Sequence, residues 1–108
     1  MADASFNEFV REQLAGLPDV EFRRMFGGHG IYQGGNFLGI LFQGRLYLKT
    51  DDTTRPDYEA AGMGKFQPNA RQTLSACLEV PAAVVEDAGQ LCAWAARAAK
   101  VSPDTPGG

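Results

Sequence analysis

Glycine-rich turns divide the first half of this chain into short apolar segments, and this division restricts the fold more than any other feature. The turns lie at residues 27–30, 33–36 and 43–44. Connections this short join neighbouring antiparallel strands, because a parallel pair needs a crossover of a dozen or more residues. The segments therefore predict an antiparallel meander. Its expected strands are Val20–Phe26, Ile31–Tyr32, Phe37–Phe42 and Arg45–Thr50.

A further strand is predicted at Thr73–Val80, where apolar and polar residues alternate. One face of this strand is expected to be core and the other to be in water. The core set is Leu74, Ala76, Leu78 and Val80, and the solvent set is Thr73, Ser75, Cys77 and Glu79. Residues 63–72 contain Gly64, Pro68 and Asn69 and are predicted to form a loop.

Three helices are predicted around these strands. Residues 5–15 begin with Ser5 and Glu8, which have the spacing of a capping box. A short helix is expected from Thr53 or Thr54 to Ala61, and a longer one after Pro81, bent or broken at Gly89. Together the elements predict an α+β fold of two layers, with the N-terminal, middle and C-terminal helices packed on one face of an antiparallel sheet.

The length and composition are those of one soluble globular domain. The chain has 108 residues, of which 44% are hydrophobic and 21% charged. We expect a single domain at residues 1–101 and a flexible tail at residues 102–108, which is rich in proline and glycine. The start has no apolar signal-peptide core, and no segment is long enough to span a bilayer, so a cytoplasmic protein without membrane contact is expected.

Charge is distributed unevenly along the chain. The net charge is −3, but residues 23–75 carry seven Arg and Lys against four Asp and Glu, which is +3, while the two ends carry three against nine, which is −6. The overall balance argues against strong nonspecific binding to duplex DNA, which requires many phosphate contacts. It leaves room for a local basic surface in the middle of the chain.

No catalytic, metal or cofactor site is predicted from short motifs. The glycines at 27, 28 and 30 resemble a phosphate cradle only loosely, since a strand rather than a helix follows them. We expect Gly27, Gly28 and Gly30 to shape the backbone, through positive φ angles or close backbone approach. His29 is the single histidine, so it has no second histidine with which to hold zinc.

The strand at residues 45–50 gives the strongest functional pattern. Alternation sends Leu46 and Leu48 to the core and Arg45, Tyr47 and Lys49 to the opposite face. Arg23 joins that face if its strand is paired there. A basic and aromatic sheet face of this kind stacks unpaired bases and contacts phosphates, or receives an acidic protein. The alternative is a solvated face whose charges pair across strands, for example with Glu79 or Glu21.

Several of these segments, taken in order, resemble the N-terminal domain of the TfoX/Sxy family of competence regulators. The resemblance runs from about Val20 to Ala98 and implies the same two-layer α/β domain. It also implies a non-enzymatic role in transcription, as in coactivators of DNA-uptake genes that work with the cyclic-AMP receptor protein. The family's C-terminal helical domain is not expected in this chain. The motifs are Met25-Phe26-Gly27-Gly28-x-Gly30-Ile31-Tyr32, Arg45-Leu46-Tyr47-Leu48-Lys49, Arg55-Pro56-Asp57 and Glu79-Val80-Pro81.

Three hypotheses follow for function. The first is a regulatory module that binds an acidic protein partner, such as a transcription regulator. The second is binding of single-stranded nucleic acid by the same surface, and the third is a small-ligand binder or enzyme near Gly28 and His29. The first strand, if it is an unpaired edge, would also support a homodimer. The predicted partner-binding residues are Arg23, Arg24, His29, Tyr32, Arg45, Tyr47 and Lys49.

Overall fold

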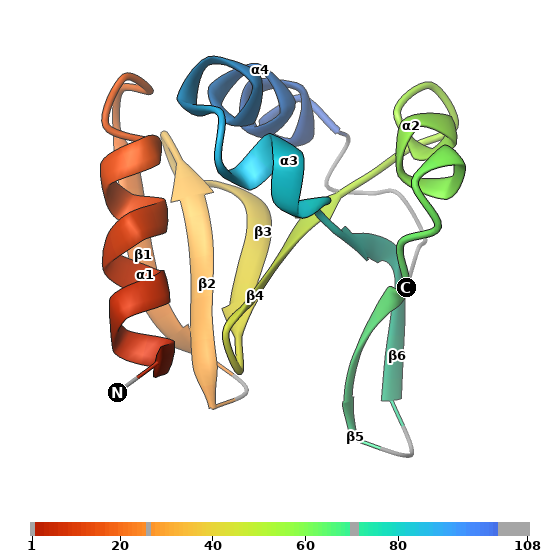
Figure 1. Ribbon diagram of the computed structural model, residues 1–108, viewed down its shortest axis with the longest axis horizontal. Coiled ribbons are helices and arrows are strands. Elements are labelled where there is room, and N and C mark those ends of the chain that lie inside the picture. Colours follow the sequence, from red (N-terminus) through yellow and green to blue (C-terminus); the bar gives the residue numbers. More distant parts are fainter. Residues whose placement is uncertain (1, 26, 70–71, 102–108) are drawn as a thin grey trace.

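The fold is a six-stranded antiparallel sheet with helices on one face (Figure 1). The computed structural model describes residues 2–25, 27–69 and 72–101; Phe26, at the end of the first predicted strand, and the tail at 102–108 lie outside these ranges. The antiparallel sheet with helices on one face confirms the predicted α+β fold. The helices are α1 (Ala2–Gln13), α2 (Arg55–Ala60), α3 (Ala82–Val85) and α4 (Ala88–Ala99). The strands are β1 (Val20–Met25), β2 (Gly28–Gln33), β3 (Asn36–Phe42), β4 (Arg45–Lys49), β5 (Lys65–Asn69) and β6 (Gln72–Glu79).

The strands follow the order β1-β2-β3-β4-β6-β5. The first four form the predicted meander, and β6 pairs with β4. After β4 the chain leaves the sheet through α2 and returns to it in β5, at the edge beyond β6. The prediction of a loop over residues 63–72 is wrong, because β5 occupies Lys65–Asn69 and β6 begins at Gln72. The loop was predicted partly because of Pro68. Proline is excluded from central strands but tolerated in an edge strand, and β5 is at the edge.

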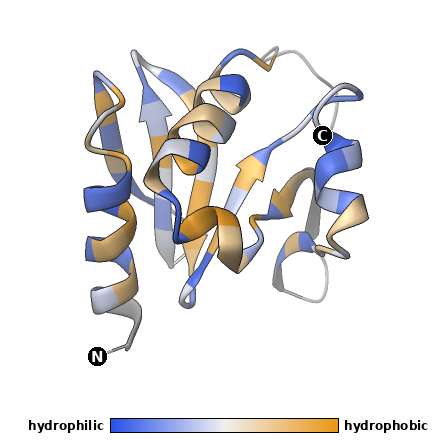
Figure 2. Ribbon diagram, turned by 45° about the horizontal axis from the view of Figure 1, so that its top comes forward, coloured by the Kyte–Doolittle hydropathy of each residue, from blue (hydrophilic) through white to orange (hydrophobic). Residues whose placement is uncertain are grey.

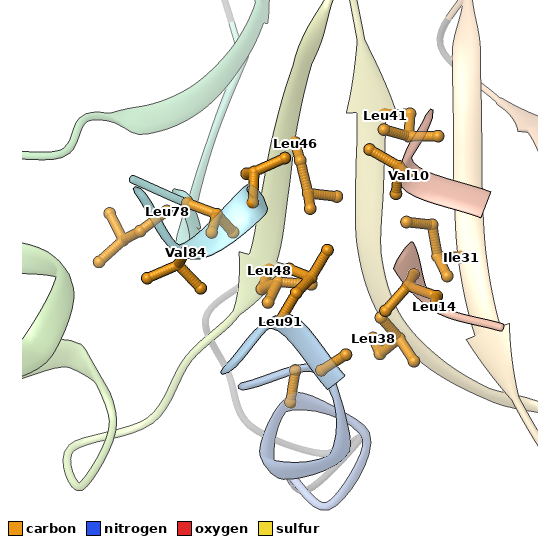
Figure 3. Packing of buried hydrophobic residues seen from close by; sticks show 14 of the residues in the cluster. Val10, Leu14, Ile31, Leu38, Leu41, Leu46, Leu48, Leu78, Val84 and Leu91 are labelled. Atoms are coloured by element: carbon orange, nitrogen blue, oxygen red, sulfur yellow. The ribbon is translucent and has the colours of Figure 1, made fainter. Parts of the chain in front are cut away.

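The main core lies between the sheet and the helices, on the side we call the helix face. Figure 3 shows Val10 and Leu14 of α1 pointing toward Ile31 and Leu41, while Leu91 of α4 meets Leu48 of β4. Hydrophobic segments in Figure 2 lie on the inner sides of the helices and strands, as expected of amphipathic elements. The buried residues of the main core are Val10, Leu14, Ile31, Leu38, Leu41, Leu46, Leu48, Tyr58, Leu78, Val80, Val84, Val85, Leu91, Ala95 and Ala98.

The helix ends differ from the predicted ones. Ser5 lies inside α1, which begins at Ala2, so Ser5 is not the N-cap. The C-terminal helical segment breaks at Glu86 and Asp87 rather than at Gly89. There the Asp87 carboxylate accepts a hydrogen bond from the Gln90 backbone N–H at 3.0 Å and caps α4. The cap, and not the glycine, therefore sets the break.

The opposite side of the sheet, the far face, carries a second apolar cluster. Ile40, Tyr47, Phe66 and Cys77 are buried there, with Phe37 and Phe42 packed against them. Phe66 projects from β5 and is 0% exposed, with its ring centroid 5.0 Å from that of Tyr47. The prediction that this face of β6 is in water is therefore wrong at Cys77, which is a buried free thiol. The missed strand β5 brings the side chain that covers this part of the face.

Candidate functional site

The seven residues predicted to bind a partner do not form one surface. Cross-strand pairing places Arg23, Gly30, Ile40, Tyr47 and Glu79 in one row across five strands, so Arg23 does share the far face with Tyr47. The two are three strands apart, about 14 Å at the usual spacing. Arg24 and His29 pair with each other on β1 and β2 and lie on the helix face. The predicted group is thus split by the sheet.

The Tyr47 side chain is not exposed on the far face. It is 8% exposed and stacks against Phe66, and burial raises the pKa of its phenol, with a further increase from nearby Glu79. Arg45 stands beside it and is mostly exposed, and its guanidinium lies 3.5 Å from the Glu79 carboxylate. This is the cross-strand charge pairing that the sequence left open as the alternative. On the far face, the start of β4 therefore carries a buried ring and a cation that is already paired.

Two glycines of the glycine-rich turn, Gly27 and Gly28, have the predicted backbone features. Gly27 has a φ of +80°, and a Cβ atom on Gly28 would lie 2.1 Å from the carbonyl oxygen of Leu41. Gly28 and Gly30 are part of β2, which starts three residues earlier than predicted. Next to them, Nδ1 of His29 is buried without a hydrogen-bond partner. Arg24, Gly27, Gly28 and His29 line a small hollow of about 370 Å³.

A larger hollow lies at the end of the sheet where β2 and β3 meet and where β4 and α4 both end. We call it the Lys49 hollow, and its volume is about 730 Å³. Two aromatic rings form one wall, and the charged side chains that line it are both lysines. Its lining residues are Tyr32, Gly35, Asn36, Phe37, Lys49, Ala99, Lys100 and Val101.

Local contacts fix the aromatic wall of the Lys49 hollow. The rings of Tyr32 and Phe37 meet edge to face, with centroids 5.5 Å apart. The Arg23 guanidinium lies 4.6 Å from the Tyr32 ring centroid and pairs with Glu21 at 3.0 Å. A cation over a ring and an edge-to-face pair both restrict the ring's position. The wall is therefore an ordered apolar surface beside positive charge.

The lysines differ from Arg23 and Arg45 in having no ion-pair partner within the described part of the chain. Lys49 is half-buried at the end of β4, and Lys100 is exposed just after α4. The arrangement suits a ligand that is negatively charged and has an apolar or aromatic part. Of the predicted residues, Tyr32 and Lys49 line this hollow, and Arg23 contacts the Tyr32 ring.

Sequence reasoning missed Phe37 and Lys100. Alternation along β3 could have placed Phe37 on the far face with Ile40 only if the β-bulge opposite Ile31 and Tyr32 had been foreseen. Lys100 is 51 positions from Lys49, and no local pattern brings them together. Their proximity depends on how α4 crosses the sheet.

Other functional chemistry is sparse. Within residues 2–25, 27–69 and 72–101, no three His, Cys, Asp or Glu side chains gather in a metal-binding group. Cys77 and Cys92 are both free, and they belong to the clusters on opposite faces of the sheet. Burial raises the pKa of the Cys77 thiol to about 11, which makes it a poor nucleophile. No helix within residues 2–25, 27–69 and 72–101 is long and apolar enough to cross a bilayer.

Comparison with known proteins agrees with this fold. The chain matches the family model for the TfoX N-terminal domain over residues 12–102. It is also 33% identical over 69 residues to an uncharacterized 12.7 kDa protein encoded in the trpE 5′ region of Spirochaeta aurantia. That alignment covers 64% of this chain and 60% of the relative.

Proposed function

Because this chain belongs to the TfoX N-terminal domain family, we propose that it is a regulatory domain that acts by binding another protein and not by catalysis. The family supports a competence-related regulatory role in general terms. The observation that carries the proposal further is the Lys49 hollow, where two lysines flank an edge-to-face aromatic pair. Such a site binds an acidic segment of a partner protein.

The partner segment is expected to combine carboxylates with one apolar or aromatic side chain. Lys49 and Lys100 attract the carboxylates, while Tyr32 and Phe37 give the apolar contact. The family resemblance makes a transcription regulator, such as a cyclic-AMP receptor protein, the first partner to test. Net charge −3 favours this reading over nucleic-acid binding, for which a strongly basic domain is the usual requirement.

The experiment compares capture of proteins from the source cells by three forms of the domain. The variant Lys49→Glu/Lys100→Glu reverses both lysines of the hollow, whereas Lys65→Glu makes the same change on β5, outside the hollow. The partner recovered by the wild type should bind roughly tenfold more weakly to the double variant and almost normally to the control. Binding of the partner to the wild type should also weaken as salt is added, because salt screens the attraction between the lysines and the carboxylates.

Two results would reject this proposal. One is equal binding of the recovered protein to the wild type and to Lys49→Glu/Lys100→Glu. The other is capture that a nuclease abolishes, since this would show that nucleic acid, and not an acidic protein, is what the domain holds.

A further inference from the structure

A third hollow lies at the other end of β4 from the Lys49 hollow, on the side of the sheet that α1 and α3 border. We call it the Phe9 hollow, and its volume is about 360 Å³. Arg45 at the start of β4 lines it, while Lys49 at the end of the same strand lines the hollow described above. Its lining residues are Phe6, Phe9, Gly44, Arg45, Leu46, Glu79, Val80, Ala82, Val85 and Glu86.

The inner surface of the Phe9 hollow is apolar. Leu46, Val80 and Val85 are buried core residues whose edges reach it. Phe6 packs against the same core, but Phe9, one turn further along α1, is 36% exposed. Among the described residues Phe9 is the one large hydrophobic side chain exposed to this degree. A ligand in the hollow would cover it and remove that apolar area from water.

The charges around the Phe9 hollow are one cation and two carboxylates. Arg45 and Glu79 form an ion pair at 3.5 Å and largely satisfy each other. Glu86, just after α3, is exposed and has no ion-pair partner in the described part of the chain. The net charge of the lining is therefore −1, opposite in sign to that of the Lys49 hollow.

From this combination we propose that the Phe9 hollow is a second binding site, which takes an apolar ring joined by a short chain to a positive charge. The volume is near the lower end of the range for ligand pockets, so it fits one ring system and not a helix. The ring lies against Phe9 and Val85, and the cation lies by Glu86. The domain then has two sites of opposite charge preference, at the two ends of one strand.

The test uses two probes with the same ring and opposite charges, tryptamine and indole-3-propionate. Each is titrated into the ¹⁵N-labelled full chain while amide chemical shifts are recorded. Tryptamine should shift the amides of Phe9, Gly44 and Ala82, which line the hollow. As read from the amides of the Phe9 hollow alone, tryptamine should bind severalfold more tightly than indole-3-propionate, because the anion meets the repulsion of Glu86 there.

Three variants locate the binding. Glu86→Gln should remove the preference for the cation, while Glu59→Gln, an equally exposed acid on α2, should preserve it. Phe9→Ala should weaken both probes, since it removes the apolar wall. Lys49→Gln/Lys100→Gln removes the positive charge of the Lys49 hollow without making it acidic. It should leave the tryptamine shifts of the Phe9 hollow unchanged, so the fate of this proposal is separate from that of the acidic-partner site.

The source of the ring and charge is decided by a third probe, acetyl-Lys-Trp-amide. Tighter binding of this peptide than of tryptamine assigns the site to a segment of a partner protein, and weaker binding assigns it to a free amine. The proposal is overturned if neither cationic probe shifts the amides that line the Phe9 hollow, if indole-3-propionate shifts those same amides at as low a concentration as tryptamine, or if Glu86→Gln retains the preference for the cation.

Discussion

The two faces of the sheet are both apolar near their centres, but they are covered by different means. On the helix face, fifteen buried residues of the described part of the chain fill the space between the sheet and α1, α2, α3 and α4. On the far face, Ile40, Tyr47 and Cys77 are covered from within the sheet, largely by Phe66 of the edge strand β5. The alternation of apolar and polar residues in a strand therefore shows which side chains share a face. It does not show whether the second face is exposed to water.

The largest effect is expected on the helix face. Leu48 is 0% exposed in the middle of the core, so Leu48→Ala removes methyl groups where sheet and helices leave little room to collapse. It should lower the free energy of unfolding by about 3–5 kcal/mol. Urea denaturation measures this change. A cost near zero would mean that the helices do not enclose this face.

Phe66→Ala tests the far face in the same way. Phe66 is also 0% exposed, but β5 is an edge strand whose pairing with β6 has two register shifts. Such a strand can move to refill part of the space, so we expect a smaller cost of about 2–3 kcal/mol. A cost above that of Leu48→Ala, in the same urea titration, would show that the far face is the firmer of the two.

The thiol of Cys77 reports directly on whether Phe66 covers the far face. Its pKa of about 11 is raised by burial, so very little thiolate exists at pH 8. In Phe66→Ala the pKa should fall toward its ordinary value, and the reaction with a thiol reagent should accelerate roughly tenfold or more. A Cys92→Ser background leaves Cys77 as the reacting thiol. An unchanged rate would contradict the covering role.

A smaller effect is expected at the start of α4. Hydrogen bonds from the backbone and side chain of Gln90 lower the pKa of the Asp87 carboxyl, so the ionised form is favoured in the folded state. Its contribution is present above the ordinary value of 3.8 and is lost as pH falls through the lowered pKa. Asp87→Ala should reduce the melting temperature by a few degrees near neutral pH and by less in acid.

Asp87→Asn is the matched control for the cap, because asparagine caps helices about as well as aspartate. It should retain most of the stability near neutral pH without the dependence on acid. If Asp87→Ala and Asp87→Asn have the same melting temperature, the capping hydrogen bond does not stabilise α4.

The smallest effect is expected for the ion pair at the start of β4. The Arg45 side chain is 63% exposed, and that of Glu79 is 25% exposed. Water and salt screen such a pair, so Arg45→Ala should change the free energy of unfolding by less than about 1 kcal/mol. A larger loss in urea denaturation would show that Arg45 packs over Tyr47 and closes the far face.

Much of the fold was accessible from local patterns in the sequence. The turns after β1, β2 and β3 are short and rich in glycine, and they fix an antiparallel meander before any tertiary contact is known. The longer helix expected after Pro81 does pack on the sheet, through Leu91, Ala95 and Ala98 of α4. The strand β5 was missed because Pro68 and its neighbours have loop propensities that an edge position tolerates.

The candidate site was less accessible, because it depends on contacts between distant segments. Alternation placed Lys49 on the face opposite the main core, and Tyr32 was among the predicted residues. Burial of Tyr47 depends on Phe66, 19 positions away on a strand that was not foreseen. Lys100 reaches the hollow because of the path of α4 over the sheet. Secondary-structure propensities describe each segment, but they do not predict these contacts between distant segments.

The central claim is that the Lys49 hollow selects acidic ligands that carry an apolar ring. Its most direct test is an amide chemical-shift titration of the ¹⁵N-labelled chain with the peptide acetyl-Glu-Asp-Phe-Glu-amide. We predict shifts at Asn36, Phe37, Lys49 and Lys100, and their loss in Lys49→Glu/Lys100→Glu. Shifts that persist in this variant, or that appear around Phe9 instead, would contradict the claim.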